Sequence, residues 1–377
     1  MSENHLHIVA FDVPAPPDYG GVIDVYYKVK ALHKLGVKIH LHCFDYGRGP
    51  KAELKKYCHK VWYYRRKTRK TLLLHKLPFI VVSRSHRGLL QRLLQDQHPI
   101  LFEGLHSCFF LDDPKLAHRI KLVRNHNVEH EYYLALARAE QNAFKKAYFS
   151  RETMKLKAFE PVLRHAQLLL AISPNDTRHF SRRYGNTEYL PAFHPEFSGQ
   201  FNPNKERVAL YHGNLGVAEN DKAARFLVSE VFAHSPFPLV IAGNNASVEL
   251  IRLVNECDNV TLLQDVNTED IREWVQRAWI NLLPTFQGTG IKLKLLFALY
   301  NGGYCMVNST MVKDTGLEEY CVVKDSAEEI IGSMEALMRL PFGEEEFAAR
   351  IRGLQETFCN ETNAARLLDW INQLKEQ

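Results

Sequence analysis

Short apolar runs alternate with longer amphipathic stretches along nearly the whole chain. The apolar runs predict buried strands, and the stretches between them, with apolar residues at helical spacing, predict helices. The predicted strands cover residues 6–11, 37–44, 99–103, 120–123 and 167–172 in the first half, and 207–212, 239–242, 260–263, 279–283 and 304–307 in the second. Regular alternation of strand and helix indicates the α/β class, with doubly wound parallel sheets.

The predicted elements fall into two groups, one in each half of the chain. At 377 residues, the chain is too long for one typical hydrophobic core and suits two domains. Residues 189–204 contain three prolines and show no hydrophobic period, so we expect the linker there. The predicted boundaries are 1–192 for the first domain, 193–204 for the linker, 205–360 for the second domain and 361–377 for a C-terminal helix.

One strand–loop–helix unit of the second half has the features of an anion site. Gly288, Thr289 and Gly290 join the strand at 279–283 to an apolar helix, and the N-terminus of a helix presents unbonded N–H groups. Lys292 and Lys294 fall in the first helical turn, where positive charge opposes the helix dipole unless an anion neutralises it. We interpret the loop as a diphosphate site. The alternative is an ordinary turn whose lysines extend into solvent.

A second glycine pair follows the first predicted strand. Gly20 and Gly21 precede a helix predicted at 22–35, and glycines there allow another molecule to approach the backbone closely. The spacing is not that of a dinucleotide fingerprint. On local sequence alone, a tight turn explains the pair equally well.

Polar side chains also gather at the carboxyl ends of two predicted strands of the first half, where open parallel sheets bind their ligands. Hydrogen-bonding groups of this kind suit a polyhydroxylated ligand. The set consists of Glu103, His106, His126, Asn127 and Glu129.

The composition indicates the cellular compartment of the protein and argues against some kinds of site. The seven cysteines are scattered and none forms a CxxC pair, which argues against a disulfide or zinc framework. No uninterrupted apolar run is long enough to cross a bilayer, and a polar N-terminus leads straight into a strand. We therefore expect a cytoplasmic protein without a signal peptide.

Taken together, the order and spacing of these pieces resemble the GT-B fold of nucleotide-sugar glycosyltransferases, and in particular the retaining family-4 type. The resemblance covers essentially the whole chain. It predicts two Rossmann-like domains that face each other across a cleft. The matching pieces are Gly20-Gly21, residues 124–133 (RNHNVEHEYY), residues 171–173 (AIS), residues 212–215 (HGNL) and residues 288–294 (GTGIKLK).

The resemblance implies a role for most of these residues. The donor diphosphate would contact Gly20 and Gly21 from the first domain, and Lys294 with Lys292 would neutralise it from the second. The nucleobase would lie near residues 264–267, which include Val266, and the C-terminal helix would cross back onto the first domain. The implied donor-binding set is Gly20, Gly21, Gly213, Asn214, Val266, Gly288, Thr289 and Gly290. The catalytic set is Lys294, Lys292, His126 and Glu103, with His106, Asn127 and Glu129 on the acceptor side.

The expected function is transfer of a sugar from a UDP- or GDP-sugar to a glycan or lipid-linked acceptor, with retention and without metal, in surface polysaccharide synthesis. The nucleotide-sugar would be a substrate rather than a cofactor. Thr289 and Phe297 occupy positions where the family usually carries two glutamates, and Asn214 stands where a basic residue is common. These departures keep a noncatalytic sugar- or nucleotide-binding relative open as the alternative.

Two further readings have less support. Glu103 and Glu129 could act as the carboxylate pair of a glycosidase, but the lysine site has no role in that scheme. A nucleic-acid binder would rest only on a basic cluster formed by Arg65, Arg66, Lys67, Arg69 and Lys70, because no recognisable nucleic-acid motif accompanies it.

The same basic cluster predicts weak docking to an anionic membrane surface, because it adjoins Trp62 and the apolar run at 72–74. Each Lys or Arg near such a surface contributes about 1 kcal/mol. Cosedimentation with anionic liposomes at low salt should therefore be lost when the five basic residues are neutralised. Equal binding by the neutralised variant would leave only a solvated basic face.

Overall fold

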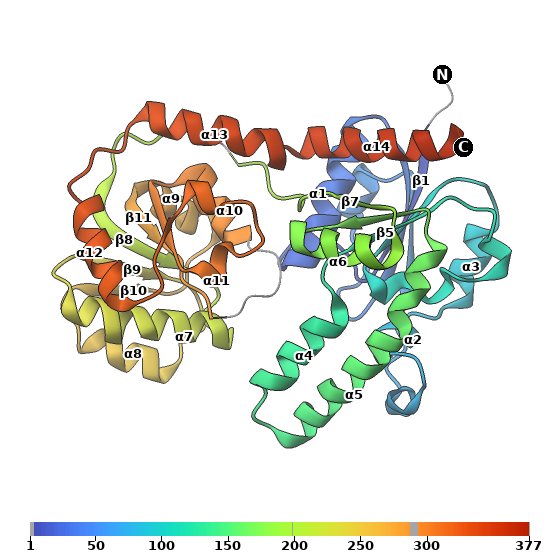
Figure 1. Ribbon diagram of the computed structural model, residues 1–377, viewed down its shortest axis with the longest axis horizontal. Helices are drawn as coiled ribbons and strands as arrows, with labels where there is room; N and C mark the ends of the chain where they lie inside the picture. The colour runs from blue at the N-terminus through green and yellow to red at the C-terminus, as the bar shows by residue number, and fades with distance from the viewer. Residues whose placement is uncertain (1–3, 198, 287–292, 377) are drawn as a thin grey trace. The chain divides into compact units, whose positions relative to one another are not determined.

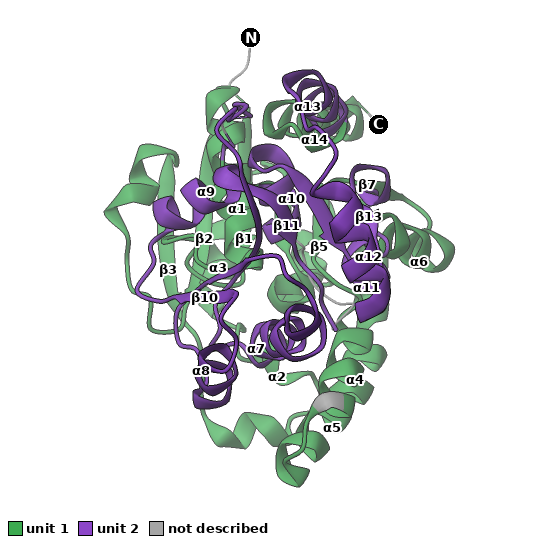
Figure 2. Ribbon diagram, turned by 90° about the vertical axis from the view of Figure 1, so that its left-hand side faces the viewer, with its two compact units in different colours: residues 1–195, 289–291, 357–377 green, residues 196–288, 292–356 purple. Residues whose placement is uncertain are grey.

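The computed structural model describes residues 4–197, 199–286 and 293–376, and the chain separates into two compact units. Among the described residues, the first unit comprises 4–195 and 357–376, and the second comprises 196–286 and 293–356 without residue 198 (Figure 2). The predicted loop residues Gly288, Thr289, Gly290 and Lys292 lie outside the described residues.

The first unit contains a parallel sheet of seven strands in the order β3-β2-β1-β4-β5-β6-β7 (Figure 1). Each neighbouring pair runs parallel. The strands are β1 (His5–Ala10), β2 (Lys38–Asp45), β3 (Lys60–Arg65), β4 (Ile100–Glu103), β5 (Lys121–Asn125), β6 (Leu168–Ala171) and β7 (Thr187–Tyr189). The order reverses between β1 and β4, so their carboxyl ends form the switch point where doubly wound folds bind ligands.

Helices cover both faces of this sheet, as the alternating pattern predicts. Alternate residues of β1 explain the two cores: Leu6 and Ile8 pack on one face, whereas Val9 packs on the other. One core is closed by α1 (Gly20–Lys34) and α14 (Asn360–Glu376). The other is closed mainly by α3 (Arg87–Leu93), α4 (Glu129–Ala139), α5 (Ala143–Phe159) and α6 (Pro174–Tyr184).

Three segments of the first unit differ from the sequence prediction, and one of them is strand β7, which was not predicted. Residues 131–164, whose bulky side chains recur at helical spacing, are mostly helical but divide into the antiparallel hairpin of α4 and α5 followed by a 3-10 helix at Glu160–His165 (Figure 1). The break occurs because Asn142 caps α5, its side chain accepting from Phe144 and Lys145 N–H. Strand β3 was not predicted, because its aromatic residues lie among charged ones.

The second unit has a parallel sheet of six strands in the order β10-β9-β8-β11-β12-β13. The strands are β8 (Glu206–His212), β9 (Leu239–Ala242), β10 (Val260–Leu263), β11 (Ala278–Leu282), β12 (Tyr304–Val307) and β13 (Val322–Val323). The helices are α7 (Ala218–Phe226), α8 (Val248–Asn255), α9 (Thr268–Arg277), α10 (Leu293–Asn301), α11 (Ser309–Val312), α12 (Ala327–Leu337) and α13 (Glu344–Phe358), the last of which ends in the first unit. A short helix α2 (Phe79–Val82) belongs to the first unit.

The structure corrects the predicted start of the first helix of this unit. The residue type of Asn220 favours a helix cap, which predicts a helix at 221–232, but α7 begins at Ala218 and Asn220 lies inside its first turn. The helix then changes to a π turn at Leu227–Val231. The side chain of Asn220 is consequently available for contacts with the neighbouring loop.

The basic cluster near β3 is partly used by the fold. Arg66 donates to Ser83 Oγ at 3.0 Å, and Lys67 Nζ donates to the Ser85 carbonyl oxygen at 2.8 Å. Arg65, Arg69 and Lys70 remain exposed, so neutralising these three is the cleaner form of the liposome test. No helix in the described part of the chain is long and apolar enough to span a membrane.

The C-terminal helix α14 is an integral part of the first unit. Leu367 and Ile371 are fully buried in the same core as α1, and Lys34 pairs with Glu361 at 2.9 Å. Asn360 Nδ2 donates to the His194 carbonyl oxygen at 2.7 Å, which ties the start of α14 to the end of the unit's first segment.

Replacing Leu367 with alanine should therefore destabilise the first unit. Truncating a fully buried leucine removes apolar contacts and leaves a cavity, at a cost of roughly 2–5 kcal/mol. Urea unfolding followed by circular dichroism measures the loss. Gln373→Ala on the exposed face of the same helix is the control, and equal stability of the two variants would contradict this account.

Candidate functional site

A network of buried charges lies at the carboxyl ends of β4 and β5. Lys28 Nζ on α1 donates to Asp24 Oδ2 at 2.9 Å and to Glu103 Oε1 at 2.7 Å. Arg124 at the end of β5 donates to Asp24 Oδ1 at 3.1 Å, and His126 Nε2 lies 3.1 Å from Glu103 Oε2. Asp24, Lys28, Glu103 and Arg124 are fully buried. The two carboxylates and two cations therefore neutralise one another in a water-poor site.

The network also holds in place the residues that follow β7. Arg124 donates to the carbonyl oxygens of Leu190 and Pro191, the latter at 3.0 Å, and Phe193 N–H donates to Asp24 Oδ1 at 2.8 Å. Burial by itself raises the pKa of Asp24, but Arg124 and Lys28 hold that pKa below its usual value. The pKa of Glu103 is lowered against burial in the same way, chiefly by Lys28. Both carboxylates are thus ionised at neutral pH.

Asp24, Glu103 and His126 also satisfy the spacing of a metal site, with one potential ligand atom from each within 4.8 Å of the others. However, Lys28 and Arg124 already bind the carboxylate oxygens that a cation would need. The arrangement is therefore a completed ion network rather than a vacant cation site. The one unused group is His126 Nδ1, which is buried without a hydrogen-bond partner in the described structure.

A second pair of groups lies beside this network. His106 Nδ1 and Glu129 Oε1 are 3.7 Å apart, and neither atom has a hydrogen-bond partner among the described residues. Burial raises the pKa of Glu129 to about 8 and lowers the pKa of His106 well below its usual value. The pair is therefore largely uncharged at neutral pH and can exchange hydrogen bonds with hydroxyl groups.

The ring of Phe11 connects the two histidines of this edge. Its centroid lies 5.5 Å from that of His106 and 5.4 Å from that of His126. A Cβ atom on Gly21 would approach Phe11 Cζ to 2.7 Å, so a larger residue there would displace the ring. Gly20 and Gly21 form the first turn of α1. Four of the predicted residues, Glu103, His106, His126 and Glu129, thus gather at one edge, and Asn127 follows directly after His126.

In the second unit, Asn220 joins the end of β8 to Lys294. Lys294 Nζ donates to Asn220 Oδ1 at 3.1 Å, and Asn220 Nδ2 donates to the Asn214 carbonyl oxygen at 2.9 Å. Lys294 Nζ also lies 5.1 Å from the ring centroid of Tyr211. These contacts place the ammonium group at the carboxyl end of β8, beside Gly213 and Asn214.

His212, the last residue of β8, is buried and uncharged. Burial and the nearby Lys294 lower its pKa to about 3, and its Nε2 atom has no hydrogen-bond partner in the described part of the chain. The ring of Phe297 meets that of His212 edge-on at 5.9 Å and also contacts Phe197 at 5.3 Å. The position where a family glutamate is usual therefore presents an aromatic ring to this edge.

The loops after β9 and β10 are joined by side-chain and backbone contacts. Asn244 Nδ2 donates to the Val266 carbonyl oxygen at 2.8 Å, and Val266 N–H donates to Asn244 Oδ1 at 3.0 Å. Close packing at this edge also explains Gly243, whose Cβ would fall 1.9 Å from the Gly213 carbonyl oxygen. Val266 thus lies in a fixed loop of the same sheet edge as Gly213 and Lys294.

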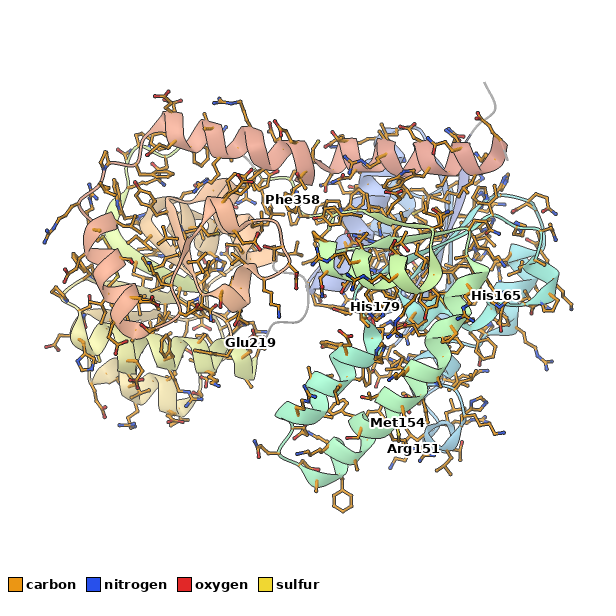
Figure 3. All side chains as sticks on the ribbon, viewed as in Figure 1. Arg151, Met154, His165, His179, Glu219 and Phe358 are labelled. Carbon is orange, nitrogen blue, oxygen red and sulfur yellow. The ribbon has the colours of Figure 1, made fainter. Side chains whose placement is uncertain are left out.

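Sequence reasoning missed several residues of these sites. Asp24 and Lys28 were overlooked although their spacing of four places two charges together on the buried side of α1, which is a legible signal. Asn220 was given the wrong role. Glu219, at the N-terminal end of α7 in Figure 3, accepts a hydrogen bond from the Thr285 hydroxyl, and no motif pointed to it.

Comparison with known proteins identifies this architecture. The chain is 26% identical over 327 residues to an uncharacterised 44.6 kDa protein in the cps region of Klebsiella pneumoniae, with 82% of this chain and 84% of that protein aligned. No family model matches the sequence.

Solved structures extend the comparison. A glycosyltransferase from Rickettsia africae aligns over the full length of both chains with a TM-score of 0.66 at 13% identity. The Anabaena protein HepE in complex with UDP and glucose gives 0.62 at 12% identity, over 98% of this chain and all of that one. A UDP-forming trehalose-phosphate synthase from Burkholderia xenovorans gives 0.63 at 9% identity, with the same coverage. The chain therefore has the GT-B fold, as the sequence resemblance predicted.

The raised pKa of Glu129 should make the free energy of unfolding depend on pH. Because burial raises its folded pKa from the ordinary 4.5 to about 8, its contribution to stability is complete below pH 4.5 and is lost as the pH rises toward 8. Glu129→Gln keeps the uncharged shape, so the variant should gain stability relative to the native protein between about pH 5 and 8. Urea unfolding at a series of pH values measures this difference.

The exposed Glu188 provides the control for that experiment. Glu188→Gln should leave the pH profile of the native protein unchanged. If Glu129→Gln also ran parallel to the native profile across this range, the raised pKa of Glu129 would be wrong.

Proposed function

We propose that this protein is a glycosyltransferase that moves a sugar from a UDP- or GDP-sugar to a glycan or lipid-linked acceptor in surface polysaccharide synthesis. The observation that carries the proposal is Lys294, held by Asn220 at the carboxyl end of β8. The fold supports it, because proteins of the same architecture include a glycosyltransferase and a protein in complex with UDP and glucose. The relative in a cps region supports the link to surface polysaccharide.

The second unit would bind the donor. In glycosyl transfer the leaving diphosphate gains negative charge, so a fixed cation beside it stabilises the transition state more than the ground state. Lys294 would supply that cation, and the N-terminus of the helix that contains it would add its dipole. His212 stays neutral in the same environment and would offer its unpartnered Nε2 atom as a hydrogen-bonding group. The loop at Val266 would adjoin the nucleobase. Lys292, Gly288, Thr289 and Gly290 would complete the diphosphate contacts.

The first unit would bind sugar hydroxyls. His126 Nδ1 is buried without a partner, and its other ring nitrogen is fixed by Glu103. A hydroxyl of the donor sugar or acceptor would complete this hydrogen bond. Glu103 then acts as a positioning residue through His126 rather than by touching the substrate, because its carboxylate is fully buried and paired with Lys28. His106, Asn127 and Glu129 would lie on the acceptor side.

This arrangement argues against glycosidase chemistry. A glycosidase needs an accessible carboxylate pair. Glu103 is fully buried and ion-paired with Lys28, so its carboxylate is not accessible to a substrate. We further propose that transfer proceeds with retention. We also propose that it proceeds without metal, because Lys294 with a helix N-terminus supplies the positive charge that a metal would otherwise provide. The protein would act in the cytoplasm, with peripheral contact at the inner face of the membrane through the basic cluster.

The second candidate is a noncatalytic sugar- or nucleotide-binding protein. It is favoured by Phe297, whose ring packs on His212 where a ribose-binding glutamate is usual. Turnover of any UDP- or GDP-sugar, followed as release of free nucleotide, distinguishes the two candidates. Nucleotide binding without turnover over a panel of donors and acceptors would support the second.

Binding of UDP and GDP, measured by isothermal titration calorimetry, tests the site itself. Lys294→Ala should weaken binding of the preferred nucleotide by roughly 10- to 100-fold, because hydrogen bonds to charged groups contribute about 1.5–3 kcal/mol. Lys313→Ala, an exposed lysine of the same unit, is the matched control and should bind like the native protein. Binding of neither nucleotide by the native protein would reject the donor site.

A further inference from the structure

The amino-terminal edge of the first sheet carries an unusual face of histidines. His5 and His7 alternate with apolar residues along β1, and His40 and His42 do so along β2. Parallel registration places His7 beside His40, so the four rings share one face of the sheet. Strands covered on both faces are normally apolar on both, so this departure calls for a physical explanation.

One half of this face is occupied by a continuous chain of hydrogen bonds in which every ring nitrogen has a partner. Asp96 accepts from His7 Nε2 at 3.0 Å, His7 Nδ1 meets His42 Nε2 at 2.8 Å, and His42 Nδ1 meets the Tyr64 hydroxyl at 2.8 Å. Both ring nitrogens of His7 and His42 are therefore satisfied. These two histidines need no further ligand.

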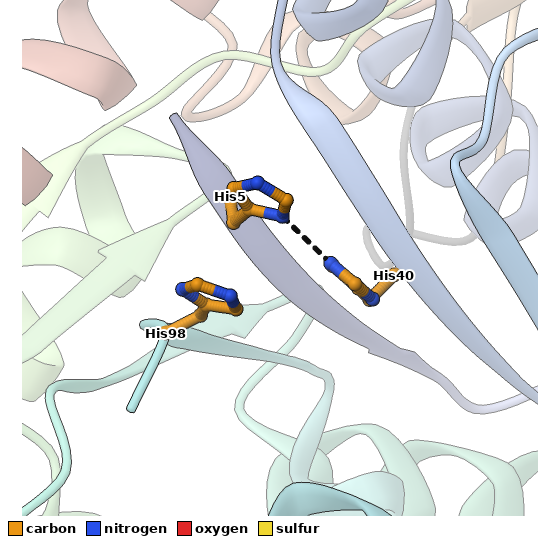
Figure 4. A group of neighbouring side chains, drawn as sticks. All are labelled: His5, His40 and His98. Carbon is orange, nitrogen blue, oxygen red and sulfur yellow. Dashed lines mark hydrogen bonds between the residues drawn. The ribbon is translucent and has the colours of Figure 1, made fainter. Parts of the chain in front are cut away.

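The other half is incomplete. His5 Nδ1 and His40 Nε2 are 2.9 Å apart, so one of them donates to the other (Figure 4). The second nitrogen of His40, Nδ1, has no hydrogen-bond partner within the described structure, although the residue is only 6% exposed. Whichever tautomer His40 adopts, one buried ring nitrogen is left unsatisfied, which is costly in a water-poor site.

A third imidazole completes a ligand set around this pair. His98, in the loop before β4, stacks on His5 with ring centroids 4.4 Å apart, and Figure 4 shows the three rings around a common space. One nitrogen from each of His5, His40 and His98 lies within 4.8 Å of the other two. Tetrahedral zinc with Zn–N bonds of about 2.0–2.1 Å requires nitrogen separations of about 3.4 Å, so the rings would turn to bring one nitrogen of each onto a common ion.

We propose that His5, His40 and His98 form a binding site for a divalent transition-metal ion, with Zn²⁺ as the preferred occupant. Three imidazoles are a ligand set that suits zinc, and water would take the fourth position. Binding would replace the His5–His98 stack and the His5–His40 hydrogen bond with coordination bonds. His5 and His98 are only partly buried, so the ion has a path from solvent.

The surroundings of the site support this assignment. The backbone N–H of His98 donates to Asp96 Oδ1 at 3.0 Å, so a carboxylate, itself paired with Arg119 at 3.2 Å, lies next to the cluster. The three ligands come from β1, β2 and the segment before β4, which are far apart in sequence and adjacent in the sheet. The ion would therefore cross-link β2, β1 and the segment before β4, a structural role called a clamp below.

A clamp at this edge is separate from the proposed donor and acceptor chemistry. Five residue steps along β1, at about 3.3 Å each, put its two ends about 17 Å apart, and the polar groups described above lie at the opposite end. Removing the ion should therefore change stability without changing the affinity for nucleotide. A failure of the proposed transferase function would leave this inference untouched.

The test uses the full-length chain without a polyhistidine tag, stripped with a chelator. Isothermal titration calorimetry should show one equivalent of saturable Zn²⁺ binding, and Zn²⁺ should raise the unfolding temperature. Co²⁺ substitution should produce the intense visible absorption of a tetrahedral nitrogen-rich site rather than the weak bands of octahedral aqueous cobalt. Absence of saturable Zn²⁺ binding would overturn the proposal.

Two variants make the test specific. His98→Ala alters a partly buried loop residue and should lower Zn²⁺ affinity by at least about tenfold while leaving the metal-free unfolding temperature close to native. His165→Ala, an exposed histidine at the end of the 3-10 helix after α5 in Figure 3, should bind Zn²⁺ like the native protein. Equal affinity in all three proteins would place the bound ion elsewhere and overturn the assignment; His5→Ala provides a second ligand variant.

Discussion

The first unit depends on mutual neutralisation among Asp24, Lys28, Glu103 and Arg124. Each of these groups would be strongly destabilising if buried alone, and removing one partner of a buried pair typically costs about 3–5 kcal/mol. The four come from α1, β4 and β5, and Arg124 reaches on to the carbonyl oxygens after β7. The charges therefore fix the relative positions of these elements. A sheet edge held in this way is rigid before any ligand arrives, which is the condition for electrostatic preorganisation.

This constraint also decides which groups remain for a ligand. The ionised carboxylates are already engaged, whereas the groups next to them are uncharged: His106 is neutral and Glu129 is mainly protonated near pH 7. His126 has one nitrogen in the network and one outside it. The first unit thus offers neutral hydrogen-bonding groups suited to sugar hydroxyls. The second unit differs, because the group at its edge is the lysine Lys294, which donates to Asn220 and lies over the ring of Tyr211, while His212 beside it stays neutral.

The sequence predicted those features that depend on residues close together along the chain. Buried strands appear as short apolar runs, and the positions of β1, β2, β4, β5 and β6 followed from them, as did the alternation that defines two doubly wound sheets. Strand β3 was missed because Trp62 and Tyr64 lie among charged residues and resemble a surface segment. Asn220 looked like a helix cap because its residue type favours that position, yet its contacts are with Asn214 and Lys294. Long-range pairs such as Lys28 with Glu103 depend on which strands become neighbours, and periodicity does not carry that information.

Phe297 shows how one substitution changes the electrostatics of the second unit. A glutamate at this position would lie against His212 and, as a nearby anion, would raise the pKa of its imidazole. Phenylalanine adds apolar surface instead, and burial together with Lys294 keeps His212 uncharged. Among the described groups at this edge, Lys294 therefore carries the positive charge without an opposing carboxylate on its own helix. Phenylalanine at this position therefore leaves α10 without an acidic side chain at this edge, where Lys294 donates to Asn220 and lies over the ring of Tyr211.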